Sequence, residues 1–382
     1  MRFFHLSDLH IGLKLMNRDL YEDQKYIFDR IIEAGKREKP DAVVIAGDIY
    51  DKSVPSAEAV DLFDYFISGL KRELPESEIM MISGNHDSVS RVNVFRTILG
   101  RQKIHMIGYP PCTEEEYIEK VTLHDPFGPV HFYLLPFVKP SMVKQIVGVD
   151  EEGRNLSYNE TLHRLIGRES VNREERNVLV SHQFYLPVGT KAEDVARMES
   201  EIRTVGDIDE VKADVLDPFD YAALGHIHKP MKVGSEYFRY SGTPLACSVS
   251  EASQDKGIIM VEMGDKGDIK TSVLPLIPLH QVRKIEGTLE DVLLQACGDY
   301  VTVVLTDEQD LDVIDMQDRL RQAFPRLLEI RRKTAFQAVY DQKFDSGKVL
   351  NPYELCCAFL GEPDDEDKAI LEDAINTVKE AL

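Results

Sequence analysis

Tryptophan is absent from this 382-residue sequence, and cysteine is scarce, with only five residues. Because none of the cysteines forms a C-x-x-C pair, we expect reduced thiols instead of a disulfide framework or a zinc knuckle. No run approaches the roughly 18 apolar residues of a membrane span. The opening MRFFHLSDLH is interrupted by polar residues where a signal peptide needs an unbroken apolar stretch. We therefore expect a cytoplasmic protein, or at least an intracellular one, with no membrane segment.

Positive charge is also in short supply. Lysine and arginine number 45 against 67 acidic residues, which gives a net charge of −22. A free-standing nucleic-acid binder needs clustered basic residues to neutralise phosphates, so the overall charge argues against one. The segment 319–333, RLRQAFPRLLEIRRK, is an exception with six basic residues and one acid. It is either a solvated helix–strand face or a patch that contacts DNA.

What the sequence does have is a regular alternation of apolar strands and amphipathic helices over its first 110 residues. RFFHLS, DAVVIAG and IMMIS are typical of buried strands. Apolar residues recur at helical spacing within 20–34 and 59–74, and a shorter helix is expected at 92–99. This alternation predicts βαβ units and a parallel sheet that is covered on both faces.

The remainder of the chain predicts a second domain. From about residue 120 the pattern becomes β-rich, and the proline-spaced LPLIPLH at 274–280 resembles a linker. Since 382 residues exceed one ordinary core, we predict a main domain at 1–278, a small α/β domain at 279–361 and an acidic amphipathic helix at 362–382. That helix either packs on its own domain or docks on a partner's coiled coil.

Polar residues follow the predicted strands at five places. In an open α/β sheet, ligands bind outside the carboxyl ends of the strands, so these places should be neighbours in space. Each cluster alone has an ordinary explanation, such as a turn, a helix cap or a satisfied core histidine. Five such strand ends together are difficult to reach by chance. The candidates are Asp8, His10, Asp48, Asp51, Asn85, His86, Asp87, His182, His226 and His228.

The donor types in these clusters indicate a metal site. Carboxylates, imidazoles and an amide oxygen without a thiolate suit Mn²⁺, iron or Zn²⁺. Seven such ligands exceed one tetrahedral shell and fit two ions that share a carboxylate, an arrangement used for in-line phosphoryl displacement. His226 and His228 are separated by one residue, and in an extended segment their side chains point to the same side. We therefore interpret them as ligands, one for each ion.

The ordered motifs resemble those of the calcineurin-like metallophosphoesterases. HLSDLHIG, ISGNHD, SHQF and YAALGHIHKP resemble in particular the nuclease subunits of the double-strand-break repair family. The resemblance implies a β-sandwich flanked by helices, with a smaller C-terminal α/β capping domain. It also assigns one metal to Asp8, His10 and His228 and the other to Asn85, His182 and His226, with Asp48 bridging the two. It further implies that His86 contacts the phosphate and that Asp51 orients His86.

The same resemblance implies a function. It implies a metal-dependent DNA nuclease of repair and recombination, with 3′–5′ exonuclease activity on double strands and endonuclease activity on single strands and hairpins. It further implies two divalent ions, with manganese as the first candidate, a coiled-coil ATPase partner and association with the nucleoid. Finally, it implies a homodimer formed through the helices at 59–74 and 92–99.

Two alternatives to this nuclease stay open at the level of the sequence. One is another dinuclear phosphoesterase that acts on nucleotides, cyclic nucleotides or phosphoproteins, and the other is a metal-bound scaffold without catalysis. The intact pair of His86 and Asp51 argues against the scaffold, and the domain after His280 argues against a minimal phosphatase. The residues themselves leave the physiological metal and the polarity of cleavage open.

Overall fold

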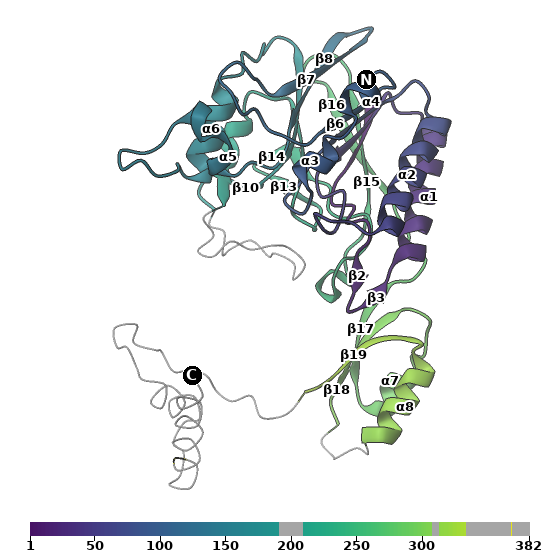
Figure 1. The fold of residues 1–382 in the computed structure, drawn as a ribbon. Helices are drawn as coiled ribbons and strands as arrows, with labels where there is room; N and C mark the ends of the chain where they lie inside the picture. The colour runs from purple at the N-terminus through teal and green to yellow at the C-terminus, as the bar shows by residue number, and fades with distance from the viewer. Residues whose placement is uncertain (191–208, 308–312, 334–367, 369–382) are drawn as a thin grey trace. The chain divides into compact units, whose positions relative to one another are not determined.

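The computed structural model describes residues 1–190, 209–307, 313–333 and 368 (Figure 1). The chain divides into two units, Met1–Lys333 and Thr334–Leu382. The C-terminal helix predicted at 362–382 lies outside the described residues except for Lys368, and so does the part of the predicted second domain after Lys333. Among the described helices, none combines the length and the apolar character needed to cross a membrane.

A six-stranded sheet joins the strands of the first 110 residues to two strands from much later in the chain. Its order is β16-β15-β1-β4-β5-β6, with β15 and β16 antiparallel at one edge. The strands are β1 (Arg2–Leu6), β4 (Ala42–Ala46), β5 (Glu78–Ile82), β6 (Ile104–Ile107), β15 (Gly257–Met263) and β16 (Ile269–Pro275). The predicted βαβ pattern is confirmed, because α1 (Tyr21–Glu38) and α2 (Ala57–Glu73) connect neighbouring parallel strands.

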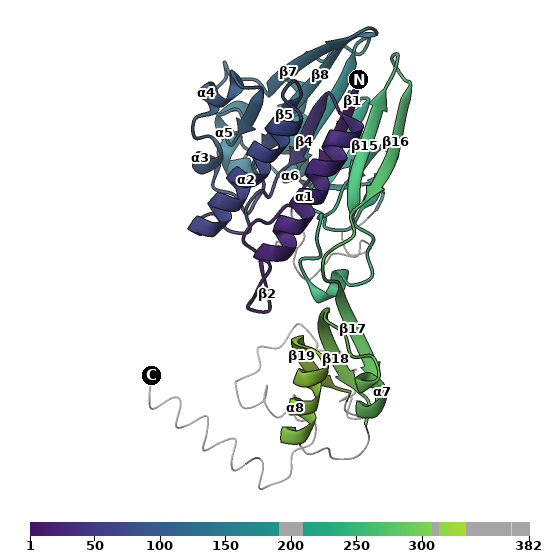
Figure 2. The same ribbon diagram turned by 90° about the vertical axis from the view of Figure 1, so that its right-hand side faces the viewer.

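Both faces of this sheet are covered, as predicted, but only one of them by helices. α1 and α2 pack on one face, where Phe4, Val43 and Ile79 share a core with them (Figure 2). The alternate side chains, including Phe3 and Val44, share a core with a second sheet. Because successive strand residues point to opposite faces, the continuous apolar run of β4 is explained by apolar layers on both sides.

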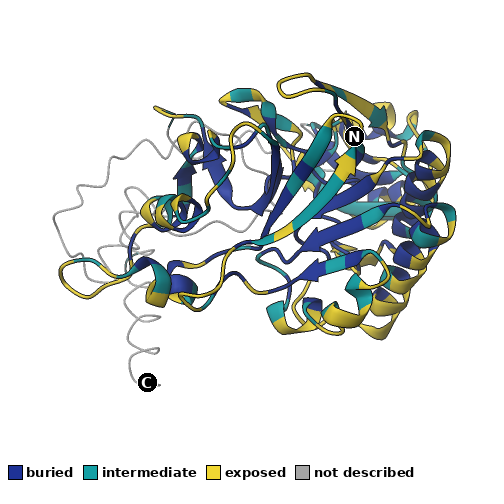
Figure 3. Ribbon diagram, turned by 90° about the horizontal axis from the view of Figure 1, so that it is seen from above, coloured by how far each residue is buried: buried dark blue, intermediate teal, exposed yellow. Residues whose placement is uncertain are grey.

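The second sheet has the order β13-β14-β12-β9-β8-β7. Its strands are β7 (Glu119–Asp125), β8 (Gly128–Leu135), β9 (Arg176–His182), β12 (Tyr221–Gly225), β13 (Met231–Val233) and β14 (Ser235–Tyr240). α5 (Pro140–Val147) and α6 (Tyr158–Gly167) share a core with its outer face. The two sheets therefore form the expected β-sandwich flanked by helices, and Figure 3 shows their strands mostly in the dark blue of buried residues.

The prediction of a single helix at 92–99 is wrong. Two short helices, α3 (Val89–Val92) and α4 (Arg96–Gly100), stand in its place. Phe95 lies between them with a φ of 58°, in the left-handed region, which interrupts a right-handed helix. α2 begins two residues before the predicted range, and its N-terminus is capped by the side chain of Ser56, which accepts the N–H of Ala59 at 3.3 Å.

The segment after the main sandwich forms a small parallel sheet of its own. β17 (Val282–Gly287), β18 (Tyr300–Leu305) and β19 (Arg326–Arg332) share a core with α7 (Leu289–Leu293) and α8 (Val313–Ala323). We call the described residues 279–307 and 313–333 the cap. The predicted linker begins later than expected, since Pro275 ends β16, an edge strand where proline is tolerated. The domain boundary predicted after residue 278 falls between β16 and β17.

The remaining described elements are short. They are β2 (Lys14–Leu15), β3 (Arg18–Asp19), β10 (Phe184–Leu186), β11 (Glu210–Lys212) and the 3₁₀ helices η2 (Ala213–Leu216) and η3 (Val249–Glu251). β2 and β3 form a small hairpin directly before α1. This hairpin lies a few residues after His10 of the predicted site, and η3 lies beside His228 in space through Glu251.

Candidate metal centre

The residues predicted for the site lie at one edge of the sandwich, where strands of both sheets end. β1, β4 and β5 belong to the first sheet, whereas β9 and β12 belong to the second. The expectation that the five strand ends are neighbours therefore extends across two sheets. Gly225 at the end of β12 lies opposite His182 at the end of β9, so His226 follows beside His182. The N–H of Asp8 donates to Gly47 O at 3.0 Å and joins the loops after β1 and β4.

Four of the predicted residues have a left-handed backbone. Asp8, His10, Asp48 and His226 have φ values of 51°, 43°, 48° and 102°. Non-glycine residues rarely adopt such angles, which persist only where the surrounding structure holds them and which cluster at functional sites. In this site, hydrogen bonds between the loops stabilise these backbone angles. The N–H of His10 donates to Asp48 O at 3.0 Å, and the N–H of His226 donates to Asp8 Oδ1 at 3.0 Å. The strained backbone thus turns these side chains toward one another.

Asp8, His10 and His228 form the first group of candidate ligands. Their ligand atoms lie within 4.8 Å of one another, and all three residues are buried. The Nε2 atoms of His10 and His228 are 3.1 Å apart. Two imidazole nitrogens that bind one ion at about 2.1 Å in tetrahedral geometry lie roughly 3.4 Å apart, so the observed separation suits a shared cation.

Asp48 is the residue that connects the groups. Its Oδ2 lies 3.3 Å from His182 Nε2, 3.7 Å from His10 Nε2 and 3.9 Å from His86 Nε2. Its Oδ1 accepts the backbone N–H of His86 at 2.9 Å, and the side chain is only 2% exposed. A single carboxylate that faces histidines from three loops has the position expected of a shared ligand.

Asn85, His182 and His226 form the second group. Asn85 Oδ1 lies 3.0 Å from His182 Nε2 and 2.9 Å from His226 Nδ1. His182 Nδ1 lies 2.8 Å from Ala46 O, and since a carbonyl only accepts, Nδ1 carries the proton of that bond. In the neutral ring Nε2 therefore offers its lone pair to the site. Acceptor atoms that face one another in this way are suited to a cation between them.

His86 and Asp51 lie at the rim of the site. Each side chain is 16% exposed, in contrast to the 2% of His10 and Asp48. His86 Nδ1 donates to the backbone carbonyl of Asp51 at 2.9 Å, so the orienting contact runs through the main chain. The carboxylate of Asp51 instead lies 3.7 Å from Nδ1 of His10. His86 Nε2 is thus left to face the interior of the site.

The donor set and its unmet bonding needs fit divalent cations. Two carboxylates, Asp8 and Asp48, are buried side by side, and burial of an anion is costly unless a positive charge offsets it. Among the described residues, the buried His10 Nδ1 has no hydrogen-bond partner, and His10 Nε2 faces His228 Nε2 and Asp48 Oδ2. The nitrogen and oxygen donors suit Mn²⁺, iron or Zn²⁺.

Comparison with known proteins identifies the family. The family model "Calcineurin-like phosphoesterase" matches residues 1–230. A curated relative, the SbcD subunit of the nuclease SbcCD from Staphylococcus saprophyticus, is 32% identical over 87% of this chain and 85% of its own length. The chain belongs to the calcineurin-like phosphoesterases and, within them, to the family of SbcD nuclease subunits.

Two further comparisons accompany this assignment. The SbcD subunit of the nuclease SbcCD from Staphylococcus epidermidis is 31% identical over 86% of this chain and 85% of its own. A solved structure, a dimetal phosphatase from Danio rerio, is 14% identical, covers 72% of this chain and 96% of its own, and has a TM-score of 0.39. Membership of the phosphoesterase family makes the chain a metal-dependent phosphodiesterase that uses divalent ions.

The electrostatics of this phosphoesterase site show a demand for positive charge. Burial raises the pKa of Asp8. Burial also opposes ionisation of Asp48, but His182, His10 and His86 together outweigh it and hold the pKa of Asp48 well below its usual value. In turn, burial alone would lower the pKa of His182, whereas the Asp48 charge raises it to about 9. Without a metal ion, the carboxylates draw a proton onto a histidine to balance their charge.

Glu251 is a further candidate residue of the site that the sequence did not indicate. Its Oε1 lies 3.2 Å from His228 Nδ1, and its Oε2 accepts from Lys256 Nζ at 2.7 Å and from Thr243 Oγ1 at 2.9 Å. A carboxylate behind a ligating histidine fixes the ring orientation and increases its basicity. Lys256 also donates to His228 O at 3.1 Å. A single acidic residue in a short 3₁₀ helix belongs to no sequence motif, so only the structure reveals its contact with His228.

Asp87 received no role from the sequence, although it belongs to the GNHD motif. Its carboxylate accepts the N–H groups of Ile49, Tyr50 and Gly84 at 2.9 to 3.0 Å. It thereby ties the loop after β4 to the loop after β5. Gly84 fits closely against this arrangement, since a Cβ there would lie 2.1 Å from Asp48 Oδ1. Asp87 therefore positions the loops that carry the ligands and does not itself face the site.

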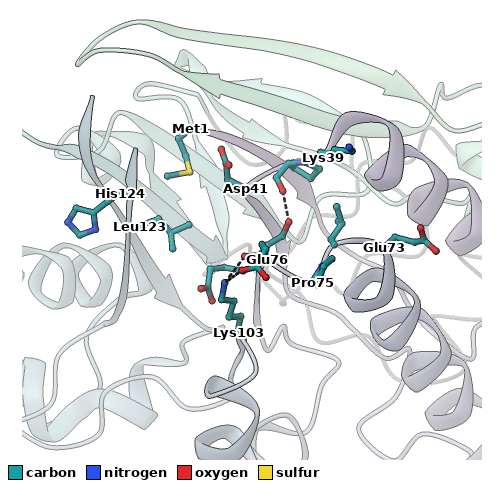
Figure 4. Close-up of a pocket in the computed structure, with 13 residues that line it drawn as sticks. Met1, Lys39, Asp41, Glu73, Pro75, Glu76, Lys103, Leu123 and His124 are labelled. Carbon is teal, nitrogen blue, oxygen red and sulfur yellow. Dashed lines mark hydrogen bonds and ion pairs between the residues drawn. The ribbon is translucent and has the colours of Figure 1, made fainter. Parts of the chain in front are cut away.

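The opposite edge of the sandwich offers a contrast. A pocket of about 420 Å³ lies there, lined by residues that precede β1, β4, β5 and β6, including Met1, Asp41 and Lys103 (Figure 4). Two of its charged side chains pair with each other, since Lys103 Nζ donates to Glu76 Oε2 at 2.8 Å. The amino ends of the strands thus carry an ion pair between exposed side chains, whereas the carboxyl ends carry the buried carboxylates and histidines of the candidate metal centre.

Proposed function

We propose that this chain is a DNA nuclease, the SbcD subunit of an SbcC–SbcD complex in DNA repair and recombination. The observation that best supports this proposal is that two groups of candidate metal ligands meet at the buried carboxylate of Asp48. DNA as substrate and an SbcC-type coiled-coil ATPase as partner are supported by the staphylococcal relatives, which are named as subunits of the nuclease SbcCD. Since its substrate is DNA, the proposed place of action is the nucleoid in the cytoplasm.

Two divalent ions complete the proposed centre. Asp8, His10 and His228 would hold one ion, Asn85, His182 and His226 would hold the other, and Asp48 would be shared. Manganese is the first candidate, because the donors are nitrogen and oxygen without a thiolate. When bound, the ions stabilise negative charge on the phosphodiester and lower the pKa of the attacking water. The protein's contribution is to hold the donors rigidly through the left-handed loops and the hydrogen bonds of Asp87 and Glu251.

His86 is the proposed residue that acts on the phosphate. Its Nδ1 proton is engaged by Asp51 O, so the second nitrogen is the one available to the substrate. In the protonated ring, Nε2 donates to a phosphate oxygen and offsets its charge, or transfers the proton to the leaving oxygen. The exposed fraction of 16% is consistent with a side chain at the entrance. Asp51 holds His86 through its carbonyl and places its carboxylate beside His10.

A homodimer is the proposed assembly. Apolar side chains remain exposed on α2 and on the turn and helix after α3, with Val60 at 44%, Phe95 at 71% and Ile98 at 62%. Exposed apolar groups of this kind tend to mark interfaces. In sedimentation, Phe95→Glu should convert a dimer into a folded monomer that keeps its metal ions but loses processing of duplex DNA. A wild-type chain that is monomeric at micromolar concentration and fully active on DNA contradicts the dimer.

The proposed nuclease function is tested by substrate choice. The purified chain, with and without its coiled-coil partner, is supplied with Mn²⁺ and given end-labelled duplex DNA, hairpin DNA or cyclic nucleotides. We expect loss of label from 3′ ends and opening of hairpins, both abolished by a chelator. Hydrolysis of cyclic nucleotides without any cleavage of DNA would support the alternative, a dinuclear phosphoesterase of small nucleotides.

A further inference from the structure

A buried carboxylate on α1 joins the main domain to the cap. Asp23 is 2% exposed. Its Oδ1 accepts the backbone N–H of His280 at 3.2 Å and lies 3.0 Å from His280 Nδ1, while its Oδ2 accepts the hydroxyl of Tyr300 at 2.9 Å. His280 precedes β17, and Tyr300 begins β18. The first turn of α1 therefore holds the base of the cap through polar contacts that are largely shielded from water.

The next residue of α1 holds the loop that carries a metal ligand. Gln24 is 3% exposed, and its Nε2 donates to His10 O at 2.7 Å. Its Oε1 accepts the N–H of Gly12 at 3.0 Å. The amide of Gln24 thus spans the loop after β1 from both sides of Ile11. Two consecutive residues of one helical turn connect the cap to the backbone of His10.

A second contact joins the same loop to the cap by a different route. Arg18 belongs to β3 in the hairpin that follows the His10 loop, and its Nη2 donates to Leu327 O of β19 at 3.2 Å. On the other side of the site, η3 packs beside β17 and carries Glu251, which contacts His228. These contacts of the cap therefore connect it to the residues that hold His10 and His228, whose Nε2 atoms face each other.

We propose that the cap positions His10 and His228 through the Asp23–Gln24 turn and η3, so that displacement of the cap weakens the ion held by Asp8, His10 and His228. The inference rests on the proposed role of these residues as metal ligands. A helical turn moves as a unit, so a shift at Asp23 is transmitted to Gln24 and to the carbonyl of His10. Coupling of this kind is reciprocal, and the bound ion in turn stabilises the docked cap.

The test removes one hydroxyl far from the site. Tyr300→Phe deletes the bond to Asp23 and keeps the ring in the core. Tyr65→Phe is the matched control, because the hydroxyl of Tyr65 donates to Asp29, also on α1, at 2.6 Å, and the described partners of Asp29 lie on α1 and α2. Both variants of the full chain are titrated with Mn²⁺ by calorimetry. Hydrogen exchange at the Gly12 amide is measured in the metal-free protein.

Tyr300→Phe should weaken one of the two ions about 5-fold or more, within the usual range of coupling between sites, and leave the other unchanged. Exchange at Gly12 should accelerate, and Tyr65→Phe should change neither quantity. If Tyr300→Phe does not fold, Arg18→Gln at the exposed hairpin should change both quantities in the same direction. Two bound ions with wild-type affinities and unchanged Gly12 exchange would overturn the coupling alone. A wild-type chain that binds no Mn²⁺ would overturn the proposed function as well.

Discussion

The metal centre and the basic segment 319–333 both concentrate polar side chains, but their partners differ. In the metal centre, Asp8, His10 and Asp48 are at most 2% exposed and face one another from loops far apart in sequence. In the segment, Arg319 pairs with Glu290 at 2.6 Å and Lys333 pairs with Glu286 at 2.7 Å, and these side chains are exposed. The buried cluster balances its carboxylates only by raising the pKa of a candidate ligand, His182, whereas the basic segment has acidic partners at the surface.

This difference separates a site from a surface. Buried carboxylates without enough donors are costly and require a cation, so their arrangement itself points to a ligand. Exposed ion pairs contribute about 0–1 kcal/mol each and form readily wherever opposite charges are close. The basic residues can exchange these acids for phosphates at little cost, but the pairs alone do not distinguish a DNA-contacting patch from a solvated face.

The largest expected effect comes from the centre of the buried cluster. Asp48→Ala removes the carboxylate shared by both groups, so we expect loss of metal and a fall in cleavage of roughly 10⁴-fold or more, or about 5.5 kcal/mol. No other single-ligand substitution should cost as much. Metal analysis by mass spectrometry and duplex cleavage measure the two effects. Two ions retained in a folded Asp48→Ala chain would show that Asp48 is not shared.

The next largest effect is expected from His86 at the rim of the site, where a substitution should lower turnover without loss of metal. His86→Ala should keep the metal content near wild type and reduce turnover by about 10²- to 10⁴-fold, the range for a general acid or charge stabiliser. Asp51→Asn should have a smaller effect on turnover, because the carbonyl that holds His86 is retained. Loss of an ion from His86→Ala would instead make His86 a ligand and place it with the buried cluster.

A smaller effect on metal affinity is expected from Glu251, which contacts the candidate ligand His228. Glu251→Gln should weaken one Mn²⁺ ion by about 10- to 100-fold, the usual cost of losing a carboxylate behind a ligating histidine, and leave the second ion in place. Glu175→Gln is the matched control, since Glu175 also pairs with a histidine, His131 at 2.7 Å, but precedes β9 at the end opposite to His182. Calorimetric titration compares the two variants. Equal Mn²⁺ affinities would remove Glu251 from the metal centre.

The smallest effect is expected in the basic segment. Arg321→Gln should weaken DNA binding by the isolated chain only a few-fold and reduce the salt dependence of binding by about one counterion, because it removes a single phosphate contact. Arg30→Gln on α1, where Arg30 pairs with Glu33, is the control. Fluorescence anisotropy at several salt concentrations measures both. Identical salt slopes for the two variants would favour the solvated face.

The sequence allowed the strand ends to be located, because each candidate directly follows a strongly apolar run. It did not reveal that β9 and β12 belong to a second sheet, since a buried strand has the same composition in either layer. The break at Phe95 was missed because apolar spacing continues through it, and only the backbone angle shows the interruption. The contacts of Glu251 and Asp23 depend on tertiary packing and have no counterpart in local sequence.

Whether two ions meet at Asp48 can be seen by anomalous X-ray diffraction from Mn²⁺-soaked crystals. We predict two anomalous peaks roughly 3.5–4 Å apart, the separation typical of two-metal sites, with the Asp48 carboxylate between them. One peak should lie against His10 and His228, and the other against His182 and His226. A single peak, or two peaks that do not share Asp48, would contradict the account.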